Sequence, residues 1–257
     1  MLLAIDVGNT ETKFGAFELR DETPLHSWRV RTEARRTVDE WGALIADLFA
    51  ASSADRSAFD AIAIASVVPK IDAVLAEACE KYLGVAPAFL KPHEQTLIAV
   101  TTERPEEVGA DLIAAAIGAR AKYGAPLVVV SYGTATVFMA ITAAGDYAGV
   151  AIAPGIGTSI DALVGRTAKL PQIALEDPGR ALGRTTVEAL QSGIVYGFVG
   201  QTEALVARFR KEMGVDAKVI ATGGMAAVVA RHSRVIDVVD AGLSLDGLRR
   251  FSCAIGT

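Results

Sequence analysis

Two short glycine turns carry the side chains in this sequence that are best suited to bind a phosphorylated ligand. The first is Asp-Val-Gly-Asn-Thr at residues 6–10, directly after an apolar run at residues 2–5. The second is Ser-Tyr-Gly-Thr-Ala at residues 131–135, directly after an apolar run at residues 127–130. A second strand-like segment follows each turn, so the same strand–turn–strand unit is predicted twice.

The residue types in these turns suit phosphate and magnesium. Glycine allows the backbone to approach a phosphate closely, and the free N–H groups of a turn can face its oxygens. A carboxylate at the end of the preceding strand, as at Asp6, can hold Mg2+ directly or through water. Ser131 stands at the corresponding place in the second turn. The alternative is a pair of ordinary β-hairpins, since glycine and asparagine suit such turns without any ligand.

A third element is Gly109-Ala110-Asp111. A kinase that acts on an alcohol needs a carboxylate within reach of the hydroxyl, while positioning and charge neutralisation supply most of the acceleration. Asp111 could be that base. It could equally be a helix N-cap, because aspartate is a preferred cap and the apolar run 113–117 follows. The residues alone leave both readings open.

A fourth element is the turn Thr222-Gly223-Gly224, which ends a predicted strand and precedes a helical stretch from Met225. On its own it could equally be a plain strand-to-helix turn. Among the turns, Asp6 is the predicted metal ligand.

Strands alternate with helical segments along the whole chain, which predicts an α/β fold. The predicted first half has strands at 2–7, 12–18, 25–31, 61–67 and 86–90, a helix at 37–53 and a helix opening at Pro69; the second half has strands at 127–131, 136–142, 147–152 and 218–221. Both halves open with three strands, which indicates a duplicated domain. We expect domains at 1–113 and 114–257, divided in a helix near 110–120. The alternative is one continuous sheet.

Composition excludes several classes of protein. The net charge of −5 over 257 residues leaves no basic footprint for nucleic acid or an anionic membrane. Two cysteines do not make a disulfide framework, and the three histidines match no zinc spacing. No apolar run reaches the ~18 residues needed to span a bilayer, and the first apolar run is broken at Asp6. We therefore expect a cytoplasmic protein with no nucleic-acid or membrane partner.

The sequence resembles the type III pantothenate kinases of the actin, Hsp70 and sugar-kinase superfamily over essentially its whole length. The matching pieces are residues 6–10, 66–69, 105–111, 133–136, 153–156, 170–171, 191–193 and 221–224. The resemblance implies two ribonuclease-H-like domains with an interdomain nucleotide cleft, ATP and Mg2+ as ligands, and a homodimer. It also implies that Asp111 is the catalytic base and that the turn 222–224 lies against the adenosine. The residues it implies as nucleotide-binding are Asp6, Gly8, Asn9, Thr10, Lys13, Gly133, Thr134, Ala135, Thr222, Gly223 and Gly224. Residues implied near the acceptor are Gly109, Ala110, Leu112 and Thr186.

The chain departs from the family pattern on the acceptor and cation sides. Leu112 stands where the family has an arginine that takes the pantothenate carboxylate, and Thr102 stands where a tyrosine commonly lines the pocket. Ser131 replaces an aspartate that helps hold a monovalent cation, so binding of K+ or NH4+ is doubtful; Val137 and Met139 replace a threonine and an aspartate. A charge-assisted hydrogen bond contributes about 1.5–3 kcal/mol, so losing the arginine would weaken carboxylate binding by roughly ten to more than a hundredfold.

The function implied by the resemblance is ATP-dependent phosphorylation of the primary hydroxyl of pantothenate, the first step of coenzyme A biosynthesis. The departures at Leu112, Thr102 and Ser131 support two alternatives. One is a weak or inactive homologue that binds nucleotide and has a regulatory role. The other is an active kinase for another small alcohol, one without a carboxylate.

Overall fold

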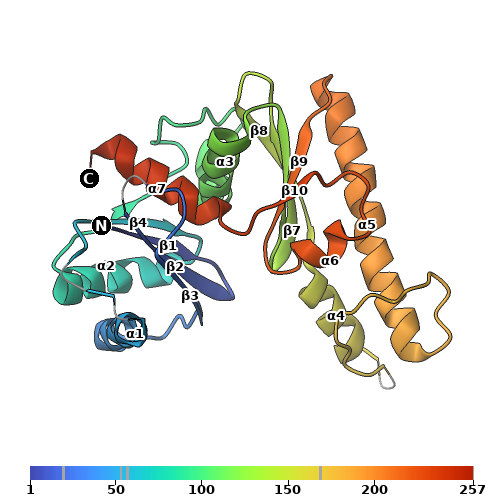
Figure 1. Ribbon diagram of the computed structural model, residues 1–257, viewed down its shortest axis with the longest axis horizontal. Helices are drawn as coiled ribbons and strands as arrows, with labels where there is room; N and C mark the ends of the chain where they lie inside the picture. Colours follow the sequence, from blue (N-terminus) through green and yellow to red (C-terminus); the bar gives the residue numbers. More distant parts are fainter. Residues whose placement is uncertain (19–20, 53, 56–57, 168–169, 257) are drawn as a thin grey trace. The chain divides into compact units, whose positions relative to one another are not determined.

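The computed structural model describes residues 1–18, 21–52, 54–55, 58–167 and 170–256 (Figure 1). The chain forms two compact units. The first comprises Met1–Lys122 together with the C-terminal segment from Gly242, and the second comprises Tyr123–Ala241.

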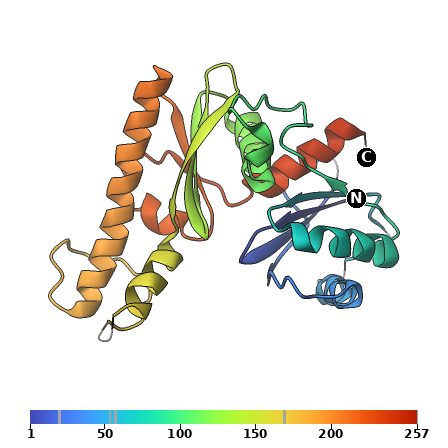
Figure 2. The same cartoon turned by 180° about the vertical axis from the view of Figure 1, so that it is seen from behind.

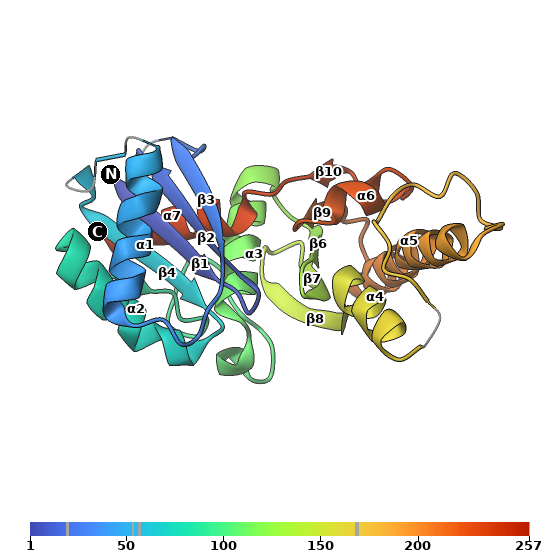
Figure 3. The same ribbon diagram turned by 90° about the horizontal axis from the view of Figure 1, so that it is seen from below.

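The first unit is a five-stranded mixed sheet with helices on both faces. Its strand order is β3-β2-β1-β4-β5, with β1 antiparallel to β2 and parallel to β4. Its elements are β1 (Leu2–Val7), β2 (Glu11–Phe17), β3 (His26–Arg31), α1 (Val38–Ala51), β4 (Ala61–Ser66), α2 (Pro69–Leu83), β5 (Ala88–Phe89), η2 (Pro105–Glu107), α3 (Ala110–Tyr123) and α7 (Leu243–Ile255). Figure 3 shows α1 and α2 covering one face of this sheet, with α7 beyond the strands.

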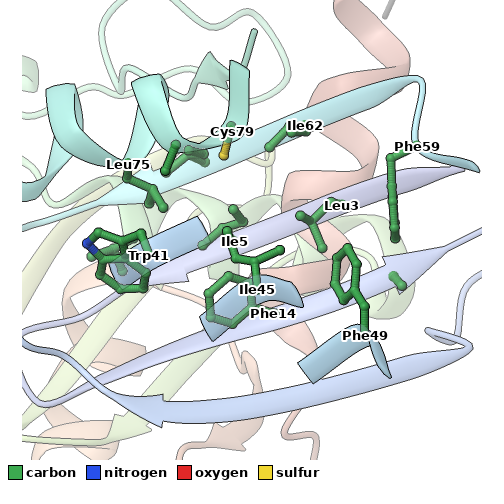
Figure 4. Close-up of a cluster of buried hydrophobic side chains, with 14 of the residues drawn as sticks. Leu3, Ile5, Phe14, Trp41, Ile45, Phe49, Phe59, Ile62, Leu75 and Cys79 are labelled. Atoms are coloured by element: carbon green, nitrogen blue, oxygen red, sulfur yellow. The ribbon is translucent and has the colours of Figure 1, made fainter. Parts of the chain in front are cut away.

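The alternation of side chains along β1 decides which residues face which helices. Leu3, Ile5 and Val7 belong to a buried cluster that includes Trp41 of α1 and Leu75 of α2, most of which is drawn in Figure 4. The other face of β1 meets α7, which contacts β1, β2 and β4. Asp6 is on that second face, because its side chain bonds to a residue of α7.

The second unit repeats the topology of the first. Its sheet has the order β10-β9-β6-β7-β8, with β6 antiparallel to β7 and parallel to β9. Its elements are β6 (Leu127–Tyr132), β7 (Ala135–Ile141), β8 (Tyr147–Pro154), α4 (Ile156–Gly165), α5 (Thr186–Met213), β9 (Lys218–Thr222), α6 (Ala226–Ala230) and β10 (Val238–Val239). Two separate sheets of equivalent order confirm the predicted duplication, and the alternative of one continuous sheet is wrong.

Helix α5 is the longest helix of the described chain and packs with α4 and α6 on the sheet of the second unit (Figure 2). The shared core includes Val130, Phe138 and Val206. The Tyr132 hydroxyl, also buried in this core, lies 2.7 Å from the Thr202 hydroxyl of α5. This hydrogen bond satisfies two polar groups that would be costly to bury alone.

The predicted strands all form, with ends shifted by at most two residues, and Pro69 opens α2 as expected. The predicted helix 37–53 forms as α1, although residue 53 lies outside the described residues. The predicted domain boundary differs from the observed division. A cut at residue 113 would fall inside α3, which continues to Tyr123, and α7 belongs to the first unit because it packs on β1, β2 and β4. Residue 257 lies outside the described residues.

Among the described residues, no helix is both long enough and apolar enough to cross a membrane.

Candidate active site

The first glycine turn closes the hairpin between β1 and β2. Asp6 and Lys13 are direct partners across these antiparallel strands, and Lys13 Nζ lies 3.1 Å from Asp6 Oδ2. Asp6 is only 4 % exposed, so its charge depends on such partners. The Gly8 N–H donates to the Glu11 carbonyl at 3.0 Å, which leaves Asn9 and Thr10 exposed at the tip of the turn.

Thr32 holds this turn by hydrogen bonds, although it is not among the residues predicted for the site. Its hydroxyl donates to the Gly8 carbonyl at 2.7 Å, and its N–H donates to the Thr10 carbonyl at 2.9 Å. The Thr12 and Thr32 hydroxyls are 2.9 Å apart. These bonds hold the Gly8 and Thr10 carbonyl groups against Thr32 and so fix the backbone of the turn. No sequence motif could have revealed Thr32, since it reaches the turn from the strand β3 side.

Asp111 lies in the first turn of α3, one residue inside the helix start. Its Oδ1 accepts from the Leu112 N–H at 2.8 Å. Burial of the carboxyl group, together with the neighbouring Asp6 carboxylate, raises the pKa of Asp111 to about 6, and the Lys13 ammonium opposes this shift. The fold therefore brings Asp6, Lys13 and Asp111 together in the first unit.

The absence of a side chain at Gly109 leaves room for the Asp111 carboxylate. A Cβ at Gly109 would lie 2.5 Å from Asp111 Oδ1 and 3.4 Å from a methyl carbon of Val67. A side chain at this place would push the Asp111 carboxylate aside, so glycine leaves the carboxylate in its present position. Ala110 is buried beside it, while Leu112 is half-buried and offers no side-chain hydrogen-bond donor.

The second hairpin resembles the first, but its turn is one residue shorter and it lacks the charged pair: the last strand pair is Val7 with Thr12 in the first hairpin and Tyr132 with Thr136 in the second. Ser131 pairs with Val137 in β7, in the same relation to the turn as Asp6 and Lys13. The Gly133 N–H donates to the Ala135 carbonyl at 3.0 Å, which closes the turn. Among the residues described here, this turn therefore has no acid–ammonium pair comparable with that of the first.

The N-terminus of α4 contacts the second turn. The Gly155 N–H donates to the Thr134 carbonyl at 3.1 Å, and the Thr158 hydroxyl donates to the same oxygen at 2.8 Å. A Cβ at Gly155 would collide with the carbonyl oxygens of Gly133 and Thr134. The glycine of the 153–156 motif thus allows helix and turn to touch.

The third turn lies beside the second within the same unit. Thr222, at the end of β9, is the register partner of Ser131 in β6. Gly223 has φ of +95°, and a Cβ there would collide with the Tyr132 carbonyl oxygen. Both facts require glycine at this place. Gly224 is exposed.

Thr186 is the first residue of α5 and is exposed. The preceding Thr185 is the N-cap, and its hydroxyl accepts from the Glu188 N–H at 3.2 Å. Thr186 belongs to the second unit, whereas Asp111 belongs to the first. Its suggested place near the acceptor stays a prediction.

The carboxylates of the first unit suit Mg2+, which takes few ligands from the protein, better than a metal ion bound entirely by side chains. No group of three or more His, Cys, Asp or Glu that could hold a metal ion occurs among the described residues. Mg2+ is usually bound through one or two carboxylates, substrate phosphates and retained waters. Asp6, whose carboxylate is close enough to raise the pKa of Asp111, offers that kind of partial site.

Two sheets of equivalent topology, each with a glycine hairpin turn, define the actin-like sugar-kinase class of α/β proteins. Solved structures support this fold across nearly the whole chain. A Baf family protein from Campylobacter jejuni has a TM-score of 0.61 and 17% identity, covering 98% of both chains. The activator of 2-hydroxyisocaproyl-CoA dehydratase from Clostridium difficile, solved with bound ADPNP, has a TM-score of 0.56 and 11% identity, covering 98% of this chain and 93% of that one.

Within this class, the chain belongs to the type III pantothenate kinase family: the sequence model of that family matches residues 2–208. The type III pantothenate kinase of Moorella thermoacetica is 44% identical over 249 residues, covering 97% of both proteins. That of Myxococcus xanthus is 43% identical over 249 residues, covering 97% of this chain and 96% of its own length. The family and the enzyme class expected from the motifs are thereby confirmed.

Proposed function

We propose that this protein transfers the γ-phosphoryl group of ATP to the primary hydroxyl of pantothenate. The observation that carries the proposal is the joint placement of Asp6, Lys13 and Asp111 in the first unit, in a chain that belongs to a kinase family. Two carboxylates and an ammonium group are what phosphoryl transfer to an alcohol requires: a metal ligand, a base and a charge partner for phosphate.

Asp6 would hold Mg2+, which when bound neutralises phosphate charge and orients the nucleotide. The Gly8–Thr10 and Gly133–Ala135 turns would supply backbone N–H groups to phosphate oxygens, in keeping with their tight closure by backbone hydrogen bonds. Lys13, whose side chain is 27% exposed, would exchange its contact with Asp6 for one with phosphate. Thr222, Gly223 and Gly224 would lie against the adenosine.

Asp111 would accept the proton of the attacking hydroxyl. A general base works best when its pKa lies near the working pH while its basic form still dominates. Burial and the Asp6 carboxylate move the pKa of Asp111 to about 6, which meets both conditions at neutral pH. Gly109 keeps the space in front of its carboxylate open.

A second candidate function is phosphorylation of a small alcohol that has no carboxylate. Leu112, next to Asp111 and without a donor, is the specific observation in its favour. A third candidate, a homologue that binds nucleotide without turnover, is supported by Ser131 and Val137 at the uncharged second hairpin. The intact site in the first unit argues against the inactive homologue, and the 43–44% identity to type III pantothenate kinases favours pantothenate over another alcohol.

The deciding experiment is a mass-spectrometric search for phosphopantothenate after incubation with ATP, Mg2+ and pantothenate. Parallel reactions with and without K+ or NH4+ would show whether Ser131 has removed a cation requirement. Product formation would establish the proposed reaction. If the protein bound ATP but formed no phosphopantothenate, and then phosphorylated another alcohol, that alcohol would be the acceptor in place of pantothenate.

Leu112→Arg is expected to lower the KM for pantothenate by about tenfold or more, because a guanidinium can pair with its carboxylate. Steady-state kinetics at saturating ATP would measure the change, and Leu112→Met, similar in size but without a charge, is the matched control. Equal KM values for the arginine and methionine variants, both folded, would argue against a carboxylate beside position 112.

We further propose that the protein is a cytoplasmic homodimer that pairs through β8. This strand is at the edge of its sheet and exposes Ile152 (67%) and Val150 (40%). An exposed apolar edge strand is a template for pairing with another chain, and a second copy offers the same edge. The exposed thiol of Cys253 suits a reducing compartment.

Ile152→Glu should convert such a dimer to monomer, since a charge would be buried against the partner strand. Light scattering after size-exclusion chromatography would measure the mass, with Leu25→Glu, at an exposed apolar residue of the first unit (52%), as the control. A dimeric mass retained by the Ile152 variant would place the interface elsewhere.

A further inference from the structure

A residue from the far end of the chain bonds directly to the predicted metal ligand. Ser244, in the first turn of α7, donates its hydroxyl hydrogen to Asp6 Oδ2 at 2.7 Å, across 238 positions of sequence. Ser244 is 8% exposed and Asp6 is 4% exposed, so water cannot readily replace either partner. The bond is therefore a fixed feature of the site.

The position of Ser244 is set by two close helix contacts. A Cβ at Gly118 of α3 would collide with the Leu243 carbonyl oxygen, and a Cβ at Gly247 of α7 would collide with the Ala114 carbonyl oxygen. Glycine at both places lets the backbones of α3 and α7 touch. Because α3 also carries Asp111 in its first turn, α7 contacts the supports of both carboxylates.

Ser244 and Lys13 differ as partners of Asp6. Both bond to Oδ2, and in the part of the chain that the structure describes no donor reaches Oδ1. The Lys13 side chain is 27% exposed and long enough to turn to another anion. Ser244 is short, buried and anchored by the helix contacts, so it stays on Oδ2 when Lys13 leaves.

We infer that Ser244 is a positioning residue, which holds the Asp6 carboxylate in one orientation for Mg2+ and so makes metal affinity depend on the seating of α7. The inference rests on the proposed function of Asp6 as the magnesium ligand. Hydrogen-bond partners of a ligating carboxylate fix its orientation, and losing one typically costs about 10–100-fold in metal affinity or activity.

The test is calorimetric titration of the full-length protein with ADP at a series of Mg2+ concentrations, without acceptor and without turnover. Ser244→Ala should raise the Mg2+ concentration needed for half-maximal enhancement of ADP affinity by about 10–100-fold. Ser244→Thr, which keeps the hydroxyl, should stay within a few-fold of the unaltered protein. Ser252→Ala removes a buried hydroxyl two turns further along α7 and should leave the Mg2+ dependence unchanged.

Thermal unfolding of each variant separates positioning from folding. A lower Tm for Ser244→Ala with an unaltered Mg2+ dependence would overturn the inference, because a merely structural serine predicts that result. Should the alanine variant not fold, Ser244→Cys, close in size and only a weak donor, must show a raised Mg2+ requirement, and an unchanged requirement would again overturn it. Mg2+-dependent ADP binding without any phosphopantothenate would instead overturn the proposed reaction and leave the role of Ser244 standing.

Discussion

Asp111→Asn is expected to lower kcat for phosphopantothenate formation by about 10²–10⁴-fold, because an amide cannot accept the hydroxyl proton. Nucleotide affinity should change little, since the Gly8–Thr10 turn and Asp6 remain. In the unaltered protein, kcat/KM should fall on the acidic side as Asp111 becomes protonated near its pKa of about 6. Rates measured between pH 5 and pH 9 as an assay range would check both statements.

Stability should move in the opposite direction in the same variant. The pKa of Asp111 is raised from 3.8 to about 6, chiefly by burial and then by the Asp6 carboxylate, so ionising it costs folded-state stability. Below the pKa of Asp111 in the unfolded chain, this loss of stability is absent. It grows as the pH rises toward the pKa in the folded protein, and it is complete above that pKa. Asp111→Asn should therefore be more stable at neutral pH by at most ~3 kcal/mol.

The control for both readouts is Asp47→Asn, at an exposed position of α1. It should keep normal turnover and show no such pH-dependent gain in unfolding free energy. Turnover retained by Asp111→Asn would remove Asp111 from the role of base. A stability difference that persists below pH 3.8 would show that its burial cost is not the cause.

Asp6→Asn is expected to remove most Mg2+-dependent ATP binding and to lower kcat/KM for ATP by about a thousandfold. Asparagine has nearly the same shape and can still accept from Ser244, but it has no charge for a metal ion. Charge stabilisation by a bound metal contributes several kcal/mol, and each 1.36 kcal/mol is about tenfold in rate. Binding titrations with and without Mg2+ would measure the first effect and steady-state kinetics the second.

The same change should lower the pKa of Asp111, because the Asp6 carboxylate is the second cause that raises it. The two variants should thus separate: Asp6→Asn loses metal-dependent binding, whereas Asp111→Asn keeps binding and loses the chemical step. If Asp6→Asn bound ATP with an unaltered Mg2+ dependence, the metal would have to be held elsewhere.

Local patterns were sufficient for most of the fold. The β1–β2 and β6–β7 hairpins follow from apolar runs interrupted by glycine turns, and their repetition correctly predicts two sheets of the same order. The register also follows from the turn, because a tight hairpin with Val7 opposite Thr12 makes Asp6 and Lys13 direct partners. Such features depend on residues close in sequence, so periodicity and turn chemistry can reveal them.

The domain boundary could not be predicted in the same way. Nothing local to residues 243–255 tells which sheet the final helix covers, and the predicted domains placed it with the second half. Its assignment depends on close packing of Gly118 and Gly247 against backbone atoms of the facing helix. Packing of this kind depends on three-dimensional shape, which one helix sequence does not contain.

Local motifs revealed the two glycine turns, the carboxylates Asp6 and Asp111, and the family, because these depend on residue types at short spacings. Which groups act on those carboxylates depends on the tertiary structure. Ser244 and Thr32 reach the first turn from other elements, and the raised pKa of Asp111 arises from burial beside Asp6. Burial and hydrogen bonding between distant segments exist only once the chain is folded, so no motif could have shown them.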